Sequence, residues 1–245
     1  DTGAPIPTNM GQPPMTMTTA TIMTTATRTT MPIDPGLLTL AQWLSPAFPI
    51  GGFAFSHGLE TAIRDSLVTD AEDLQDWLQD LLEDGSGRSD AIWMMLALRA
   101  PSADEVAALD AEARAFQPSS ERLRETVRQG EAFARVVNDV WDTDLPSLCL
   151  PIAVGRAARL QGFDPKSTAA LYLQSFVSNI VSAAVRLVPL GQTEGQRVIA
   201  ALSPLCEQVA NDSVSAGPED IYSNCFLSDV AAMRHETQEP RLFQS

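Results

Sequence analysis

The sequence predicts an all-α protein, a bundle of roughly eight to ten helices that follows a low-complexity N-terminal tail. Apolar residues recur at helical spacing almost everywhere after residue 36, and helix-capping patterns separate these stretches. Strand-like alternation bounded by hairpin turns is absent from the sequence. Residues 37–245 are therefore expected to form one helical domain.

Residues 1–36 differ in composition from the rest of the chain. They hold five of the eight methionines, many threonines and almost no charge. Without an apolar period such a segment cannot bury enough surface to offset its ordering entropy, so we expect it to be disordered. It also lacks the positive and continuous apolar regions of a signal peptide.

The first half of the domain reads as a series of capped helices. Residues 37–44 form the first, which Pro46 ends. Thr69 and Glu72 are typical of a capping box and open a second helix, which ends at Gly85. Residues 89–100 are apolar nearly all round, which predicts a buried helix. A second box at 102–105 opens an alanine-rich helix that reaches residue 116.

The second half continues in the same way. Residues 119–141 form a long amphipathic helix, whose predicted core side is Leu123, Val127, Phe133, Val136, Val137 and Val140. A helix over 148–160 precedes Gly162, a typical left-handed end. Asp164 and Pro165 start the most hydrophobic helix, to about 187. Thr193 to Gln196 is a third capping box, opening a helix over 194–210 with a kink at Pro204. Residues 211–227 are expected to be a loop, before a short helix at 228–237.

The charge balance excludes several classes of partner. The chain has 31 acidic and 16 basic residues, for a net charge of −15. A protein that tracks a nucleic-acid backbone needs a basic stripe, which is not visible, and an anionic membrane surface is disfavoured for the same reason. A basic protein partner or simple solubility fits better. No charge-free apolar run reaches about 18 residues, so no transmembrane helix is expected.

Cysteine and histidine are too few for an obvious metal site. Cys149, Cys206 and Cys225 are odd in number and form no CxxC, which disfavours a disulfide framework or structural zinc and is typical of a reducing cytoplasm. His57 and His235 are the only histidines. One chain cannot build a borderline transition-metal site from these two alone, although a two-fold dimer could pair equivalent histidines.

Ser56, His57 and Glu60 suggest a hydrolase at first sight. Adjacent residues rarely place a serine hydroxyl and an imidazole in productive geometry, and no G-x-S-x-G elbow is present. Ser56 can instead cap the following helix, with His57 in its first turn. We therefore expect no enzyme activity and keep a small helical enzyme using His57 and Glu60 as the alternative.

Two further features suit protein contacts. Phe48, Phe53 and Phe55 lie in an irregular segment, where they either plug the bundle or form a partner face. Arg186, in an apolar helix, needs an acidic or carbonyl partner or projects toward an interface.

The C-terminal stretch is polar over 233–238 and ends in Arg241, Leu242 and Phe243 after Pro240. It suits a docking peptide that folds on binding, unless Leu242 and Phe243 pack back onto the bundle.

Three stretches together resemble the UreF family of urease accessory proteins: AQWLSPAFPIGGFAFSHGLE (41–60), SAAVRLVPLGQTEGQ (182–196) and MRHETQ (233–238). The resemblance extends over most of residues 37–245. It implies a homodimeric, cytoplasmic, all-helical protein with no catalytic activity or cofactor of its own. It also implies binding to the accessory protein UreD (also called UreH) and to the GTPase UreG. Their assembly acts on apo-urease, where nickel delivery and lysine carbamylation are coupled to GTP hydrolysis.

The resemblance also implies which residues meet partners. It places 233–243 against the UreD-type protein, and 53–60, Arg186 and 192–196 at protein interfaces. The implied partner-binding residues are Phe53, Phe55, Ser56, His57, Gly58, Glu60, Arg186, Gln192, Gln196, Met233, Arg234, His235, Glu236, Thr237, Gln238, Arg241, Leu242 and Phe243.

Two departures from the family pattern are expected to alter docking of the tail. Glu239-Pro240 replaces the usual Tyr-Thr, and Gln244 replaces an arginine. A further alternative to the scaffold is direct nickel carriage by His57, His235 and Cys225.

Overall fold

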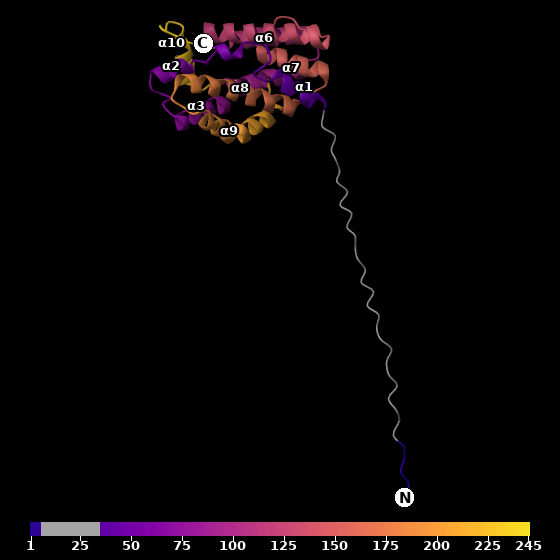
Figure 1. The fold of residues 1–245 in the computed structure, drawn as a ribbon. Helices are drawn as coiled ribbons and strands as arrows, with labels where there is room; N and C mark the ends of the chain where they lie inside the picture. Colours follow the sequence, from indigo (N-terminus) through magenta and orange to yellow (C-terminus); the bar gives the residue numbers. More distant parts are fainter. Residues whose placement is uncertain (6–34) are drawn as a thin grey trace. The chain divides into compact units, whose positions relative to one another are not determined.

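The computed structural model describes residues 1–5 and 35–245, and within them it contains α-helices and two 3-10 turns but no strand (Figure 1). The predicted all-α class is therefore confirmed. The helices are α1 (Pro35–Trp43), α2 (Leu59–Arg64), α3 (Ala71–Glu83), α4 (Ser86–Arg99), α5 (Ala103–Ala115), α6 (Ser120–Trp141), α7 (Leu150–Gln161), α8 (Pro165–Leu187), α9 (Gln192–Ser213) and α10 (Phe226–His235). The 3-10 turns are η1 (Gly52–Ala54) and η2 (Pro218–Asp220).

The disorder predicted for residues 1–36 falls mostly outside the described residues and stays a prediction. Its C-terminal boundary is corrected, because α1 already begins at Pro35.

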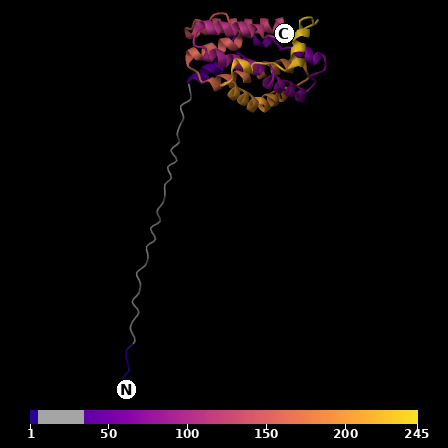
Figure 2. The same cartoon turned by 180° about the vertical axis from the view of Figure 1, so that it is seen from behind.

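The bundle is built around α8, whose buried residues include Tyr172, Phe176 and Ile180. In Figure 1, α6 and α7 lie on one side of α8 and α9 on the other, and the view from behind in Figure 2 shows the same order. By length and composition α8 could cross a membrane, but 56% of the relevant window is buried inside the protein. That burial is typical of the core helix of a bundle.

Several helix ends follow the local signals in the sequence. Ser102, Ser119 and Asp164 are the N-cap residues of α5, α6 and α8, and each side chain accepts a backbone N–H from the first turn. Gly162 ends α7 in the left-handed region, with φ of 69°. These ends were predictable because capping involves only residues within one turn of the boundary.

Two capping boxes are shifted from their predicted register. Asp70, not Thr69, caps α3 by accepting the N–H groups of Glu72 and Asp73. A carboxylate one residue along thus replaces the hydroxyl as the acceptor.

At the start of α9, the Gly191 N–H donates to Glu194, so the helix begins at Gln192 rather than at 194. It continues through Pro204 to Ser213, into the predicted loop, while the predicted kink at Pro204 stays a prediction. Two other helices also begin early, α4 at Ser86 rather than 89 and α10 at Phe226 rather than 228.

The largest difference from expectation lies in α6. Phe133 and Val137 are buried as predicted, but Val140 is 59% exposed. The N-terminal half of the helix buries a polar set instead of the predicted apolar side: Glu121, Arg122, Glu125, Thr126 and Gln129. Arg122 and Gln129 both bind Glu125 on the same helix, whereas Glu121 meets His235 and Glu125 meets Ser245 from the distant tail, which helical periodicity does not report.

Candidate functional site

The candidate site is the place where the C-terminal segment is held against α2 and α6. Figures 1 and 2 both show α10 beside α2 at one end of α6, with the C-terminus next to it. We call this contact the C-terminal clasp and define it by Ser56, Glu60, Glu121, Glu125, His235 and Ser245.

A sharp turn before α2 brings the first two clasp residues into place. His57 and Gly58 both have positive φ, 55° and 77°, and Gly58 is the N-cap of α2. A Cβ at Gly58 would lie 2.7 Å from the backbone nitrogen of Ala232, so only glycine allows α10 to approach this closely. His57 thus precedes α2 instead of lying in its first turn as predicted. The Ser56 hydroxyl does accept the Glu60 N–H, at 3.4 Å.

Glu60 fixes the last residues of the chain. Its carboxylate accepts the backbone N–H groups of Leu242 at 2.7 Å and Phe243 at 2.9 Å. Beyond them, the Ser56 N–H donates to the carbonyl oxygen of Ser245 at 2.8 Å, and the Ser56 hydroxyl donates to the same oxygen. The tail is therefore held through its backbone as well as its side chains.

His235 lies fully buried between two carboxylates. Its Nδ1 is 2.7 Å from Glu121, and its Nε2 is 3.2 Å from Glu60. Because these carboxylates face opposite nitrogens of the ring, one metal ion could not contact all three side chains. Among the described residues no group of three or more histidine, cysteine, aspartate or glutamate side chains is arranged to hold a metal ion.

Glu125 is the second centre of the clasp. Its carboxylate accepts hydrogen bonds from the Ser245 hydroxyl at 2.7 Å, from the Gln129 amide at 3.1 Å and from Arg122, and it lies 2.8 Å from His57 Nε2. Burial alone would raise the pKa of Glu125, but the Arg122 guanidinium and the His57 ring outweigh it and lower this pKa to about 2. Glu125 is therefore ionised throughout the physiological range.

His57 pairs with Glu125 as a neutral imidazole. Burial, and then the positive charge of Arg122, lower the pKa of His57 in spite of the nearby carboxylate. Its Nε2–H donates to Glu125, which leaves Nδ1 buried and without a partner among the described residues.

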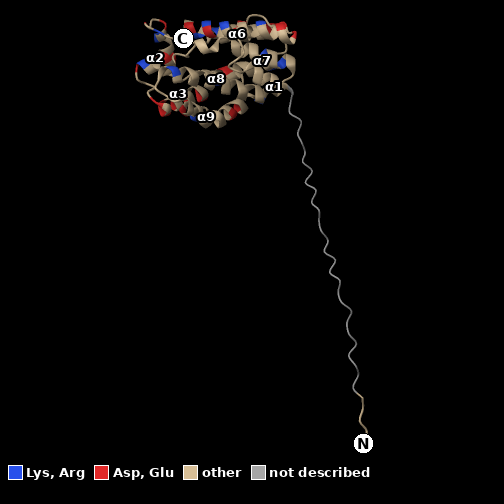
Figure 3. Cartoon of the chain, viewed as in Figure 1, with Lys and Arg blue, Asp and Glu red and all other residues tan. Residues whose placement is uncertain are grey.

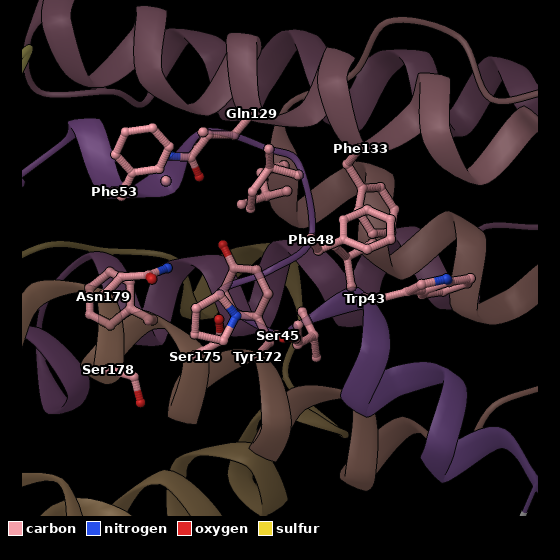
Figure 4. A pocket seen from close by; sticks show the side chains of 18 of the residues that line it. Trp43, Ser45, Phe48, Phe53, Gln129, Phe133, Tyr172, Ser175, Ser178 and Asn179 are labelled. Carbon is pink, nitrogen blue, oxygen red and sulfur yellow. The ribbon is translucent and has the colours of Figure 1, made fainter. Parts of the chain in front are cut away.

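A cavity of about 260 Å³ opens beside His57. Figure 4 shows Gln129 and Phe133 entering it from α6, and Tyr172, Ser175 and Asn179 from α8. The Tyr172 hydroxyl donates to Asp90 at 2.7 Å, and burial raises the pKa of Asp90 to about 6 although Arg122 and Tyr172 oppose it. The cavity thus offers amide groups, an imidazole nitrogen and a carboxyl group that titrates near neutral pH to a small polar occupant.

The structure divides the eighteen predicted partner-binding residues into two sets. Seven are buried inside their own chain: Phe55, Ser56, Gly58, Glu60, His235, Gln238 and Phe243. Ten are exposed: Phe53, Arg186, Gln192, Gln196, Met233, Arg234, Glu236, Thr237, Arg241 and Leu242. His57 is intermediate.

The aromatic and arginine expectations are resolved in the same way. Phe48 and Phe55 are buried and plug the bundle, whereas Phe53 is 71% exposed. Of the partners expected for Arg186, the structure shows a carbonyl, because its guanidinium donates to the Phe53 carbonyl at 2.9 Å. The guanidinium carbon also lies 4.5 Å from the centre of the Phe243 ring. Phe243 packs back onto the bundle, but Leu242 is 79% exposed.

The residues of the two alternative functions make separate contacts. Ser56 binds the Ser245 carbonyl, His57 binds Glu125, and Glu60 binds His235 and the tail, so they do not form a nucleophile–base pair. For the nickel-carrier alternative, the three side chains have different partners. The Cys225 thiol donates to the carbonyl of Asp80, whereas the histidines contact glutamate side chains.

Sequence reasoning missed the half of the clasp that α6 provides. The two clasp residues of α6, Glu121 and Glu125, are in line with Gln129, Phe133 and Val137 at a helical spacing of four residues. Polar residues that continue an apolar stripe signal a buried polar network, and this pattern could have identified them.

Comparisons with known proteins agree on one family. A family model described as UreF matches residues 68–203. The chain is 53% identical over 208 residues to a urease accessory protein UreF of Roseobacter denitrificans, covering 85% of this chain and 93% of that protein. It is 47% identical over 214 residues to the UreF of Ruegeria pomeroyi, covering 87% and 99%. It is 52% identical over 213 residues to the UreF of Cereibacter sphaeroides strain KD131, covering 87% and 100%.

Proposed function

We propose a function from one premise: this chain belongs to the UreF family of urease accessory proteins. Its role is an accessory one in urease maturation. Within that role, the protein is a non-catalytic scaffold that joins a UreD/UreH-type protein and the UreG GTPase for GTP-dependent nickel insertion into apo-urease. It acts as a cytoplasmic homodimer without a bound cofactor of its own.

The observation that carries this proposal is that the tail buries some of its side chains in its own bundle and exposes another to solvent. The clasp buries His235, Gln238 and Phe243, while Leu242 between them in the chain is 79% exposed. A large apolar side chain held outward by buried neighbours is a ready contact for another protein. Because the tail is already ordered on its own bundle, a partner need not supply the free energy of ordering it.

α10 also exposes apolar side chains. Phe226 and Met233 are 75% and 49% exposed, and they lie seven positions apart on one face of the helix. We assign this face and Leu242 to the UreD-type partner. Phe53, Arg186 and the first turn of α9 are left for a different contact, which we assign to the GTPase.

The test is Leu242→Asp in the full-length chain. We expect loss of co-elution with the UreD-type protein and loss of urease activation in cells that hold the whole urease gene set. The thermal midpoint should stay unchanged, because an exposed side chain contributes little to stability. Size-exclusion chromatography with light scattering measures the complex, and it measures the dimer in the same experiment.

Leu160→Asp is the matched control, since Leu160 is 48% exposed on α7, outside the clasp. This variant should bind and activate like the natural chain. A Leu242→Asp variant that still forms the complex and supports activation would refute the tail assignment. A chain that is monomeric and ignores both partners would refute the scaffold.

A further inference from the structure

A cleft of about 250 Å³ lies on the outer side of the clasp. Arg124, Arg128 and Arg241 line it together with Glu121, Gln244 and the aromatic side chains of Phe55 and Phe243. Two of the arginines lie one turn apart on α6, and the third comes from the tail. The cleft therefore exists only where the tail is held on α6.

The cleft carries an excess of positive charge in a strongly acidic protein. Glu121 is its one carboxylate, and a single oxygen of that group takes Arg241 at 2.6 Å and Arg124 at 3.3 Å. The other oxygen is used by His235. Among the described residues, the hydrogen-bond partner of Arg128 is the neutral amide oxygen of Gln244, at 3.1 Å.

One other acid lies close, but it is already engaged. Hydrogen bonds from Ser120 lower the pKa of Glu236, and the charge of nearby Arg124 contributes less to the same shift. Figure 3 shows blue segments interspersed with red ones along α6 beside the C-terminus. The net charge of the chain is −15, so this cluster is a local exception.

The guanidinium groups keep donors free for a ligand. The side chains of Arg124 and Arg241 are 56% and 42% exposed. Arg241 donates to Glu121, and Arg124 donates to Glu121 and through Nε to the Ser120 carbonyl. Each guanidinium has five N–H donors in a planar fork that matches a carboxylate. The cleft can thus accept further carboxylates without breaking the clasp.

The surroundings select a peptide over other anions. Three arginines around one cleft do not make the extended basic stripe that a nucleic acid or an anionic membrane needs, whereas a short peptide segment needs only one such cluster. Leu242, the tail residue between Arg241 and Phe243, is 79% exposed and adds apolar surface beside the cleft that a small inorganic anion cannot use. A segment that combines acidic and apolar side chains can contact both the arginines of the cleft and Leu242.

We propose that this cleft, lined by Arg124, Arg128 and Arg241, binds an acidic segment of a partner protein, with carboxylates on the guanidinium groups and an apolar residue against Leu242. The inference goes beyond the proposed function, because it names the chemistry of a bound segment and does not depend on urease. The free energy of binding this segment is largely electrostatic, so its affinity should fall as the salt concentration rises.

The experiment uses the full-length chain and a fluorescein-labelled peptide of alternating glutamate and leucine. Fluorescence anisotropy should show saturable binding at low salt. The Arg124→Gln/Arg128→Gln variant should weaken it about tenfold, the equivalent of roughly one charge-assisted pair. Arg241 is left unchanged so that the clasp stays intact. Lys166→Gln/Arg197→Gln, which removes the same charge from exposed positions on α8 and α9, should change binding less than about twofold.

Several outcomes overturn the proposal. The first is absence of saturable binding, or equal binding of a glutamine–leucine peptide. The second is an equal loss in the Lys166→Gln/Arg197→Gln control, which would mean only general electrostatic attraction. Displacement by inorganic phosphate as effective as by the peptide would indicate a small-anion site. Concentration-dependent association that the arginine variant abolishes would make a second copy of this chain the occupant. If peptide binding fails while the UreD-type complex still forms, the inference fails and the proposed function stands.

Discussion

At the scale of single residues, the protein is organised by buried carboxylates with complete sets of partners. Glu125 is 1% exposed and receives a cation, an amide, a hydroxyl and an imidazole. Removing one member of such a set leaves a buried charge without compensation, which costs more than the net gain of the pair. The clasp is therefore sensitive to every one of its polar members.

The lowered pKa of Glu125 has a direct consequence for acid stability. Its folded-state pKa is about 2, below the ordinary value of 4.5. A depressed carboxyl pKa contributes stability above the unfolded-state value, and that contribution is lost as the pH falls toward the folded-state value. The clasp should thus weaken between about pH 4.5 and pH 2.

Asp90 has the opposite sign and gives the first prediction. Its pKa is raised to about 6 from 3.8, so it contributes stability at acid pH that is lost as the pH rises through about 6. Asp90→Asn removes this loss and keeps an acceptor for the Tyr172 hydroxyl. At about pH 7.5 we expect the variant to gain roughly 2–3 kcal/mol over the natural chain in free energy of unfolding, from the difference in pKa.

Urea unfolding between about pH 4 and pH 7.5 measures this gain. The difference between variant and natural chain should grow through that window. Asp104→Asn, an exposed position in the first turn of α5, serves as the control and should show no such trend. A difference that is constant with pH would contradict the raised pKa of Asp90.

At the scale of elements, most helix ends are capped by residues close in sequence, but the start of α6 is also capped by a residue of α10's end, far along the chain. Glu236, at the end of α10, accepts the N–H of Ser120 at 2.7 Å and its hydroxyl at 2.8 Å. A carboxylate from the tail thus satisfies a free donor at the start of α6, where a negative charge is also favourable. This contact joins α10 to α6 beside the clasp.

The cap of α3 gives the second prediction. Asp70→Ala removes the acceptor for two backbone N–H groups and should lower the free energy of unfolding by about 1 kcal/mol. Thr69→Ala should cost less, because Thr69 only donates to the exposed carboxylate of Asp73. Chemical unfolding of both variants checks this, and the reverse order of costs would restore the capping box predicted at Thr69.

At the scale of the whole molecule, the bundle depends on close crossings between helices. Gly155 of α7 faces the backbone of α4, and a Cβ at this position would lie 2.1 Å from the carbonyl oxygen of Met94. Backbone cannot move aside as the end of a flexible side chain can. The packing distance between α4 and α7 is therefore set by a single missing methyl group.

The third prediction follows from this crossing. Gly155→Ala should destabilise the fold by about 1–3 kcal/mol or more, although alanine favours a helix over glycine. For a domain of this size that lowers the thermal midpoint by roughly 2–4 °C per kcal/mol. Gly195→Ala is the comparison, since its added Cβ would meet only valine side chains at 3.0–3.1 Å. Equal midpoints for the two variants would show that the crossing tolerates expansion.

The helical class, the capped helix ends and the family resemblance could all be predicted from the amino-acid sequence alone. Caps such as Ser102 and Asp164 and the left-handed Gly162 act within one turn, so their patterns can be read directly from neighbouring residues. The capping error at Thr69 arose because a second candidate acceptor, Asp70, stands directly beside it. Periodicity also identified residues 165–187 as the most hydrophobic helix, because apolar side chains recur along most of its length.

The burial of polar residues and the contacts that hold the tail could be seen only in the three-dimensional structure. His235 meets Glu121 across 114 positions, and Ser56 meets Ser245 across 189. Hydrophobic periodicity assigned α6 an apolar core side, because it ranks each residue by its own polarity rather than by its partners. A buried polar side chain is stable only when its hydrogen bonds are satisfied, and here the satisfying groups come from opposite ends of the chain.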